Sequence, residues 1–213
     1  MTAVDLNSCR LYGILDLSYV SNPQVSDVAA TMIDGGVDLI QLRAKDTALE
    51  EVTAVGRKLL EVTRRCGVPL VINDHAEVAR ELGAEGVHVG QDDLSVAKAR
   101  EIAGSQCFIG KSTHSLEQAT RAAEEGADYI GFGPLFATPT KPDYTPIGTA
   151  DIREVHARVQ LPIFCIGGIK IENLPDVIAA GARRVVIVSG ILKAPDIEHY
   201  ARGAKSLLDE SRS

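Results

Sequence analysis

The chain has 213 residues, of which 45% are hydrophobic and 24% are charged, as in an ordinary globular protein. Its 22 Lys and Arg against 29 Asp and Glu give a formal net charge of −7. This acidic balance argues against binding nucleic acid or anionic membrane through bulk charge, so neither partner is expected. No Pro-rich or Ser-rich linker divides the sequence, and we expect residues 1–213 to form a single domain.

The four cysteines predict a reducing compartment. They lie far apart and form no Cys-x-x-Cys pair: Cys9, Cys66, Cys107 and Cys165. A reduced Cys in or beside an apolar run behaves as a small hydrophobe. Residues 1–5 contain no basic flank leading into an apolar stretch, and later uncharged runs are short and broken by Gly or Pro. We therefore expect an unprocessed, cytoplasmic protein.

A recurring sequence motif indicates alternating helices and strands. In it, a helix-ending Gly is followed by a small residue and then an apolar run, beginning at Gly36, Gly83, Gly126 and Gly181. Gly accepts the positive φ that closes a helix before a short turn into a strand. The motifs recur at intervals of roughly 50 residues, about twice the length of one strand–helix unit. A second set of strands should therefore lie between them.

That second set is present, and the count reaches eight strands. In chain order they are residues 11–15, the run after Gly36, residues 70–72, the run after Gly83, residues 107–109, the run after Gly126, residues 163–166 and the run after Gly181. Amphipathic stretches separate them, and Ser95, Ser115 and Asp196 are expected helix N-caps. The pattern predicts an α/β fold with all-parallel strands, a single (β/α)8 TIM barrel. An open doubly wound sheet is the rival, but no Gly-x-Gly-x-x-Gly follows the first strand.

In such a barrel the chemistry gathers where the strands end. Gln41, Arg43 and Lys45 alternate with Leu42 and Ala44 after the second strand, so the three polar side chains point to one side. An Arg and a Lys together can clamp a phosphate. The alternative is a solvated strand end with two surface cations.

Two aspartates follow neighbouring strands and suggest a metal. Asp74 and Asp93 could supply the one or two carboxylates that Mg²⁺ commonly takes, with water and substrate phosphates completing its shell. Taken singly, each Asp fits a helix N-cap better. Taken with Arg43, Lys45 and Lys141 on one rim, metal and cations around a diphosphate become the better interpretation.

The last two strands end in small residues. Gly167-Gly168 and Val188-Ser189-Gly190 stand where this fold commonly holds phosphate through backbone N–H groups, although tight turns without a ligand remain the alternative. The long loop after the sixth strand carries Thr138, Thr140 and Lys141 among prolines that restrict its backbone. His88 is expected to be a core histidine with a satisfied ring. His114 either moves a proton, caps a helix or orients its neighbours.

These residues together resemble the thiamine phosphate synthase family, also called thiamine-phosphate pyrophosphorylase. The resemblance spans nearly the whole chain, in seven phrases: Gln41-Leu42-Arg43-Ala44-Lys45, Asn73-Asp74, Gly86-Val87-His88-Val89-Gly90-Gln91-Asp92-Asp93-Leu94, Ser112-Thr113-His114, Gly126-Ala127-Asp128-Tyr129-Ile130-Gly131-Phe132-Gly133-Pro134, Thr138-Pro139-Thr140-Lys141 and Ile166-Gly167-Gly168-Ile169. It implies a transferase that condenses 4-amino-2-methyl-5-hydroxymethylpyrimidine diphosphate with a thiazole phosphate to give thiamine phosphate and pyrophosphate.

The resemblance also implies roles for individual residues. The pyrimidine diphosphate would be held by Gln41, Arg43, Lys45, Asn73 and Lys141, with Ser112 on the pyrimidine or the leaving diphosphate and with Leu42, Ala44 and Pro139 in the same binding phrases. The thiazole phosphate would be received by Thr138, Thr140, Gly168, Val188 and Ser189. Mg²⁺, the expected cofactor, would be carried by Asp74 and Asp93. The catalytic set would be Arg43, Lys45, Ser112 and Lys141.

Two features depart from the family pattern, Leu17-Ser18-Tyr19 after the first strand and the lack of a second Lys after Pro142. The runner-up is the thiazole tautomerase on the same scaffold, an isomerase that needs neither pyrophosphate nor its metal. A non-catalytic barrel that binds a phosphorylated metabolite is a third interpretation. The expected partners are the two small-molecule substrates, and a homo-oligomer stays open.

Overall fold

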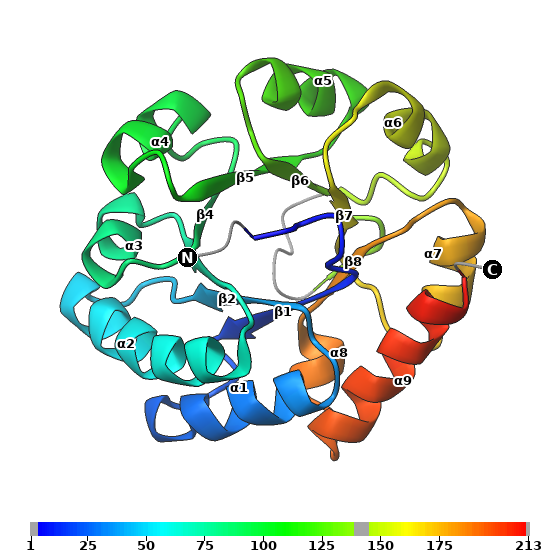
Figure 1. The fold of residues 1–213 in the computed structure, drawn as a ribbon. Helices are drawn as coiled ribbons and strands as arrows, with labels where there is room; N and C mark the ends of the chain where they lie inside the picture. The colour runs from blue at the N-terminus through cyan, green and yellow to red at the C-terminus, as the bar shows by residue number, and fades with distance from the viewer. Residues whose placement is uncertain (1–3, 139–144, 212–213) are drawn as a thin grey trace.

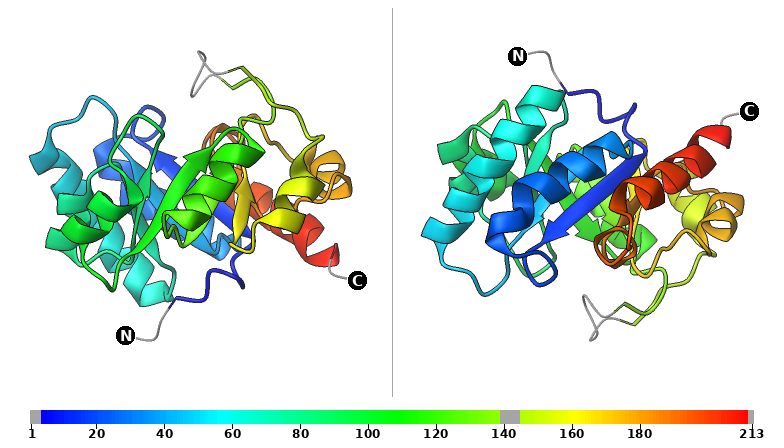
Figure 2. Two further views of the ribbon diagram at one scale, coloured as in Figure 1. Left: turned by 90° about the horizontal axis from the view of Figure 1, so that it is seen from above. Right: turned by 90° about the horizontal axis from the view of Figure 1, so that it is seen from below.

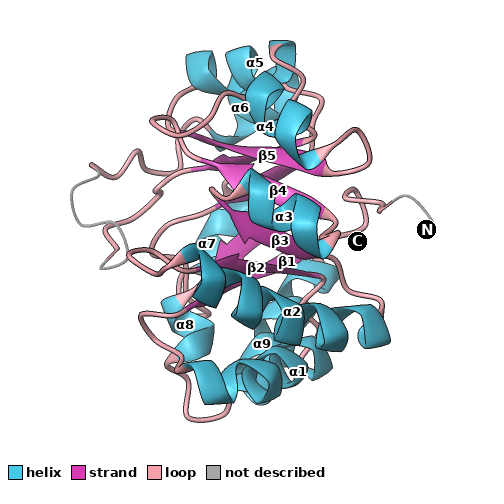
Figure 3. Cartoon of the chain, turned by 90° about the vertical axis from the view of Figure 1, so that its left-hand side faces the viewer, coloured by secondary structure: helices cyan, strands magenta, loops and turns pink. Residues whose placement is uncertain are grey.

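A computed structural model describes residues 4–138 and 145–211. Its eight parallel strands close into a barrel in chain order, from β1 to β8 and back to β1 (Figure 1). Helices surround the strands in every view (Figures 2 and 3). The predicted (β/α)8 TIM barrel is therefore confirmed.

The strands and helices alternate along the chain. The strands are β1 (Leu11–Asp16), β2 (Leu39–Arg43), β3 (Leu70–Asn73), β4 (Gly86–Val89), β5 (Phe108–Thr113), β6 (Tyr129–Phe132), β7 (Ile163–Cys165) and β8 (Val185–Ile187). The helices are α1 (Val25–Asp34), α2 (Leu49–Cys66), α3 (Ala76–Leu82), α4 (Val96–Ala103), α5 (Leu116–Glu124), α6 (Ile152–Arg158), α7 (Leu174–Ala179), α8 (Ser189–Leu192) and α9 (Ile197–Glu210), with a short 3-10 turn η1 (Asn22–Gln24) before α1. Among the described residues, no helix is both long and apolar enough to cross a membrane.

The three expected helix N-caps are confirmed. Ser95 accepts a hydrogen bond from the backbone N–H of Lys98, and Ser115 accepts one from Gln118. Asp196 does the same for His199 at the start of α9. Each side chain satisfies one of the N–H groups that a first helical turn leaves without a partner. These caps fix where α4, α5 and α9 begin.

The strands bury both of their faces. One apolar cluster fills the layer between the barrel and the helices, and a second fills the barrel interior. In the interior, the ring of Phe164 packs edge-on against Tyr12 and Tyr129, with ring centroids 5.4 and 5.5 Å apart. Alternate side chains of a strand point to opposite faces, so each strand serves both layers.

The segment before β1 covers the amino ends of the strands. Leu6 and Cys9 are buried in the interior cluster, and Figure 1 shows this segment crossing the barrel. Asp38, just before β2, accepts hydrogen bonds from the backbone N–H groups of Arg10 and Leu11 and ties the segment down. Polar residues that face a ligand must then lie at the opposite, carboxyl end, as the fold predicts.

Candidate active site

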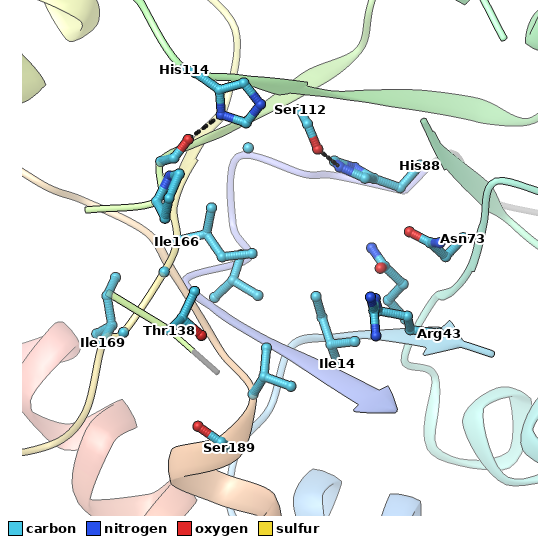
Figure 4. A pocket seen from close by; sticks show the side chains of 18 residues that line it. Ile14, Arg43, Asn73, His88, Ser112, His114, Thr138, Ile166, Ile169 and Ser189 are labelled. Atoms are coloured by element: carbon cyan, nitrogen blue, oxygen red, sulfur yellow. Dashed lines mark hydrogen bonds between the residues drawn. The ribbon is translucent and has the colours of Figure 1, made fainter. Parts of the chain in front are cut away.

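A cleft opens at the carboxyl ends of the strands, and Figure 4 shows side chains from both sides of the barrel turned toward it. Its empty volume, including the open mouth, is about 800 Å³. The lining residues come from β1 to β8 and the loops that follow them: Ile14, Gln41, Arg43, Asn73, His88, Ser112, His114, Gly131, Gly133, Pro134, Thr138, Ile166, Gly167, Gly168, Ile169, Val186, Val188 and Ser189.

Among the described residues that line the cleft, Arg43 is the one Lys or Arg. It pairs across the strands with Asp16, in register at the ends of β2 and β1, through Nη1 and Oδ2. Asp16 is only 1% exposed, and its other oxygen accepts the backbone N–H of Ser18 at 2.9 Å. Burying a carboxyl group is costly unless it is paired and hydrogen-bonded in this way. Asp16 therefore fixes the guanidinium, a role that sequence reasoning missed although an acid and a base end adjacent strands.

Lys45, Asp74 and Asp93 form a charged group at the outer rim. The Lys45 ammonium contacts the Asp74 carboxylate. The pKa of Asp74 is raised, first by burial and then by the facing carboxyl of Asp93, against the opposing effect of Lys45. Two neighbouring carboxylates repel each other unless a cation or a proton lies between them, so the pair could hold a divalent cation.

Neither aspartate caps a helix, so that alternative is wrong. The N-cap of α3 is His75 and that of α4 is Ser95. Asp93 instead accepts the backbone N–H of Gly90 at 2.8 Å, which closes the turn after β4. Within residues 4–138 and 145–211, no three His, Cys, Asp or Glu side chains group together as a metal site. Among the described residues, the rim therefore offers a metal no more than a pair of carboxylates from these side-chain types.

The turn after β4 is also anchored from β5. Lys111, 6% exposed, donates from Nζ to the Gly90 carbonyl at 2.7 Å. The amide of Gln91 donates to the Ser112 carbonyl at 2.5 Å. The sequence predicted no role for Lys111, because the residues around a Lys near the end of a strand do not show whether that Lys is buried. Both bonds hold the segment that carries Asp93 against the strand that carries Ser112.

The opposite side of the cleft is built from backbone. Gly167 and Gly168, which follow β7, have φ of 99° and 64°. A Cβ at Gly167 would lie 2.4 Å from Cα of Pro134, and one at Gly168 would lie 2.7 Å from Cβ of Phe136. Only glycine fits both the conformation and the space. Val188 and Ser189 complete this side at the start of α8.

The structure brings half of the predicted site residues into one cleft: Gln41, Arg43, Asn73, Ser112, Thr138, Gly168, Val188 and Ser189. Leu42 and Ala44 are buried in the helix-facing cluster, so only their backbone could reach a ligand there. Lys45 and the two aspartates stand outside the lining, on the rim. Pro139, Thr140 and Lys141 lie outside the described residues. The ligand roles of all these residues stay predictions.

The two histidines of the cleft are held by hydrogen bonds. Both ring nitrogens of His88 have partners, the hydroxyls of Tyr129 and Ser112, each at 2.9 Å. This confirms the expected satisfied histidine, although His88 also lines the cleft. The Nδ1 atom of His114 contacts the Gly133 carbonyl (Figure 4). The backbone N–H of His114 donates to the side-chain oxygen of Gln118. His114 therefore joins β5 to the loop after β6, which fits an orienting role.

Comparisons with known proteins agree on one family. The family model described as thiamine monophosphate synthase matches residues 11–191. A thiamine-phosphate synthase from Shouchella clausii is 41% identical over 203 residues, which cover 95% of this chain and 97% of that protein. One from Thermus thermophilus is 46% identical over 175 residues, covering 82% and 84% respectively.

Solved structures give the same picture. The thiamine phosphate pyrophosphorylase from Pyrococcus furiosus superposes with a TM-score of 0.88 at 30% identity, covering 98% of this chain and 99% of that one. The 3-hexulose-6-phosphate synthase from Salmonella typhimurium superposes with a TM-score of 0.70 at 18% identity, which shows a shared fold alone. The sequence comparisons and the Pyrococcus furiosus structure thus point to the same family.

Proposed function

The chain belongs to the thiamine monophosphate synthase family, and from this premise we propose that it is a transferase that makes thiamine phosphate. Its substrates are 4-amino-2-methyl-5-hydroxymethylpyrimidine diphosphate and 4-methyl-5-(2-phosphoethyl)thiazole, and its second product is pyrophosphate. One observation carries the assignment to this site. One cleft joins a side built on Arg43 to a side built on Gly167 and Gly168, which suits two phosphorylated substrates held side by side.

The charged side serves the pyrimidine diphosphate. Arg43, fixed by buried Asp16, presents a planar fork to the phosphate oxygens, and Lys45 adds a point charge at the rim. Lys141, by family resemblance, brings a further cation from the loop after β6. Gln41, Asn73 and Ser112 line the inner part of this side and hold the pyrimidine ring. Opposing charges here stabilise the pyrophosphate as it leaves.

The glycine side serves the thiazole phosphate. Gly168, Val188 and Ser189 line the cleft with little side-chain bulk, and backbone N–H groups in such turns can hold phosphate oxygens. Thr138 and, by resemblance, Thr140 add hydroxyl donors from the loop after β6. Binding on this side places the thiazole nitrogen beside the carbon that carries the diphosphate, and holding two reactants in this way removes much of the entropic barrier.

The reaction then needs no protein nucleophile. The bond between the pyrimidine methylene carbon and the diphosphate oxygen breaks, and its electron pair leaves with pyrophosphate. The resulting carbocation is stabilised by the aminopyrimidine, and the thiazole nitrogen donates the pair that forms the new C–N bond. The protein therefore has to position the two substrates and neutralise the charge of the pyrophosphate, and the residues of the cleft suit both tasks.

Asp74 and Asp93 would hold Mg²⁺ in this scheme. Their carboxyls face each other at the rim next to Lys45, and oxygen ligands of this kind suit the ion. When bound, Mg²⁺ supplies positive charge to the diphosphate. We also infer a cytoplasmic protein with one domain over residues 1–213 and no nucleic-acid or membrane partner, and we leave a homo-oligomer open.

A product assay tests the function. The protein is incubated with both precursors and Mg²⁺, and thiamine phosphate and pyrophosphate are quantified, with each precursor omitted in turn. Equal amounts of the two products, requiring both precursors, support the synthase. Isomerisation of a thiazole precursor without the pyrimidine would instead make the chain a tautomerase, and absence of both reactions would favour a binding barrel.

The metal proposal has its own test. A chelator should abolish product formation and added Mg²⁺ should restore it. Asp93→Asn removes one negative ligand at nearly constant size, so this variant should require about tenfold more Mg²⁺ for half-maximal rate. The neighbouring exposed Asp92 gives the matched control, Asp92→Asn, which should keep the wild-type Mg²⁺ requirement. Product formation that is indifferent to the chelator would reject the metal.

A further inference from the structure

A chain of hydrogen bonds crosses the interior of the barrel between two residues of the cleft. Gln41 Nε2 donates to the Tyr12 hydroxyl at 2.6 Å, and the Tyr12 and Tyr129 hydroxyls are 3.0 Å apart. The Tyr129 hydroxyl is 2.9 Å from Nδ1 of His88. The other ring nitrogen of that histidine, Nε2, is 2.9 Å from Ser112 Oγ (Figure 4). Five strands, β2, β1, β6, β4 and β5, each contribute one member.

The middle of this chain is buried below the cleft. Tyr12 is 1% exposed and Tyr129 is fully buried, whereas Gln41 and Ser112 at the two ends line the cleft. Burial raises the pKa of both tyrosines, so each phenol keeps its single hydrogen at neutral pH. A buried hydroxyl between two partners is satisfied when it donates to one and accepts from the other, because accepting from both would leave its own hydrogen buried without an acceptor.

These single hydrogens give the chain a direction. Tyr12 accepts from Gln41, so it donates its hydrogen to Tyr129. Tyr129 in turn donates to Nδ1 of His88, which leaves the imidazole hydrogen on Nε2. That hydrogen is donated to Ser112, whose own hydroxyl hydrogen is left to point at a ligand.

The two ends therefore carry opposite hydrogen-bonding character. In the direction above, Gln41 offers its carbonyl oxygen as an acceptor in the cleft and Ser112 offers its hydroxyl as a donor. Reversing any one bond reverses every other bond in the chain, and both ends change together. An end cannot switch on its own while each phenol and the neutral imidazole carry one hydrogen.

We propose that Tyr12, Tyr129 and His88 are positioning residues that fix Gln41 as an acceptor and Ser112 as a donor, and thereby select an aromatic ring bearing an amine. The proposal rests on the proposed function. The aminopyrimidine ring carries an amine that donates and ring nitrogens that accept, which complements this pair. A 4-oxo pyrimidine presents the reverse, an accepting oxygen beside a donating ring N–H, and leaves both ends mismatched.

The test is a ratio of two affinities. Dissociation constants for the amino diphosphate and for its 4-oxo analogue are measured by calorimetry with Mg²⁺ and without the thiazole phosphate, so that no turnover occurs. Wild type should prefer the amino compound. In Tyr129→Phe, which cuts the chain at its centre, the preference should fall about tenfold, because both ends can then reorient. The ratio is insensitive to the fraction of protein that is folded.

The matched control is Phe164→Leu. Phe164 packs against the same two tyrosines and takes no part in the hydrogen bonds, so its variant should keep the wild-type ratio. An unchanged ratio in Tyr129→Phe, or an equal fall in Phe164→Leu, would overturn the positioning role. Wild type that binds neither diphosphate would overturn the proposed function and this inference with it.

A second measurement does not depend on substrate. Nitrogen-15 NMR of the imidazoles should show His88 as the neutral tautomer with its hydrogen on Nε2 in wild type. In Tyr12→Phe, Tyr129 is free to accept from His88 as well as to donate, so a mixture of tautomers should result. Tyr12 bonds to Tyr129 and Gln41, so a change at His88 must travel along the chain. The same single tautomer in both proteins would contradict the proposal.

Discussion

The two sides of the cleft are built by different means. From β2 to β4, the cleft and its rim present charged side chains that are themselves held by partners, as Arg43 is held by Asp16. From β7 to β8, the cleft presents backbone that side chains would obstruct, as at Gly167 and Gly168. Both sides face phosphate under the proposed function. One meets it with opposite charge and the other with N–H groups.

This difference determines which substitutions each side should tolerate. Removing side-chain atoms should damage the charged side, because the lost charge has no substitute. Adding atoms should damage the glycine side, because the space is already taken by the loop after β6. The two kinds of variant can therefore locate each substrate separately.

The largest effect is expected from Arg43→Ala. Loss of the guanidinium removes a charge aimed at the leaving diphosphate and should lower kcat/KM by about 10²- to 10³-fold. Steady-state kinetics with varied pyrimidine diphosphate measures it. Arg57→Ala, at an exposed ion pair with Glu81 on the outer helices, is the control and should keep wild-type rates. Normal turnover in a folded Arg43→Ala protein would contradict the proposal that the charged side of the cleft binds the diphosphate.

A smaller effect, about tenfold or somewhat more, is expected from Gly168→Ala. The new Cβ would lie 2.7 Å from Cβ of Phe136 and would push the two loops apart, raising KM for the thiazole phosphate. Gly67→Ala is the matched control. Gly67 has a similar φ of 70° at the end of α2 but has no atom within 4 Å of the added Cβ. A rise in KM only for the pyrimidine diphosphate would contradict the assignment of the glycine side.

The smallest effect concerns stability alone. His156 lies on α6, outside the glycine side of the barrel, and its Nε2 is buried without a hydrogen-bond partner in the described part of the chain. Its pKa is lowered to about 4, first by burial and then by the charges of Arg183 and Arg184. The unfolded chain therefore takes up a proton on this group at higher pH than the folded chain does.

Stability should consequently fall as the pH drops from about 6.5 to about 4. Partial exposure reduces the effect, which we expect to be on the order of 1 kcal/mol. His156→Gln should flatten this part of the stability curve, measured by urea unfolding at several pH values, and should leave turnover at neutral pH intact. The exposed His199→Gln provides the control. If wild type and His156→Gln lose the same stability as the pH falls, His156 is not the cause of the acid sensitivity.

The sequence was sufficient to predict the barrel and to predict that the side chains of Gln41 and Arg43 point to the same side of their strand. Alternation along a strand has a period of two, so residues 41 and 43 share a face wherever the strand lies. Glycines at 167 and 168 likewise suggested a close approach or a tight turn, and both residues have positive φ, 99° and 64°. In these cases the structural requirement is local to a few residues.

What the sequence did not predict depends on pairs that are distant along the chain. The Asp16–Arg43 pair requires the register of β1 on β2, and the Tyr12–Tyr129 bond requires opposite strands to meet inside a closed barrel. The roles of Asp74 and Asp93 also could not be read from the sequence, in which each residue resembles a helix N-cap. In the structure the N-caps are His75 and Ser95, and Asp93 accepts the backbone N–H of Gly90. Contacts of this kind follow from closure of the barrel.

The division of the cleft can be tested most directly by titrating pyrophosphate. Calorimetry with Mg²⁺ should show that Arg43→Ala weakens pyrophosphate binding by at least about tenfold, whereas Gly168→Ala binds it as wild type does. Pyrophosphate carries no pyrimidine or thiazole ring, so the result reports only where the diphosphate lies. Equal weakening by both variants, or a loss confined to Gly168→Ala, would contradict the placement of the diphosphate on the charged side.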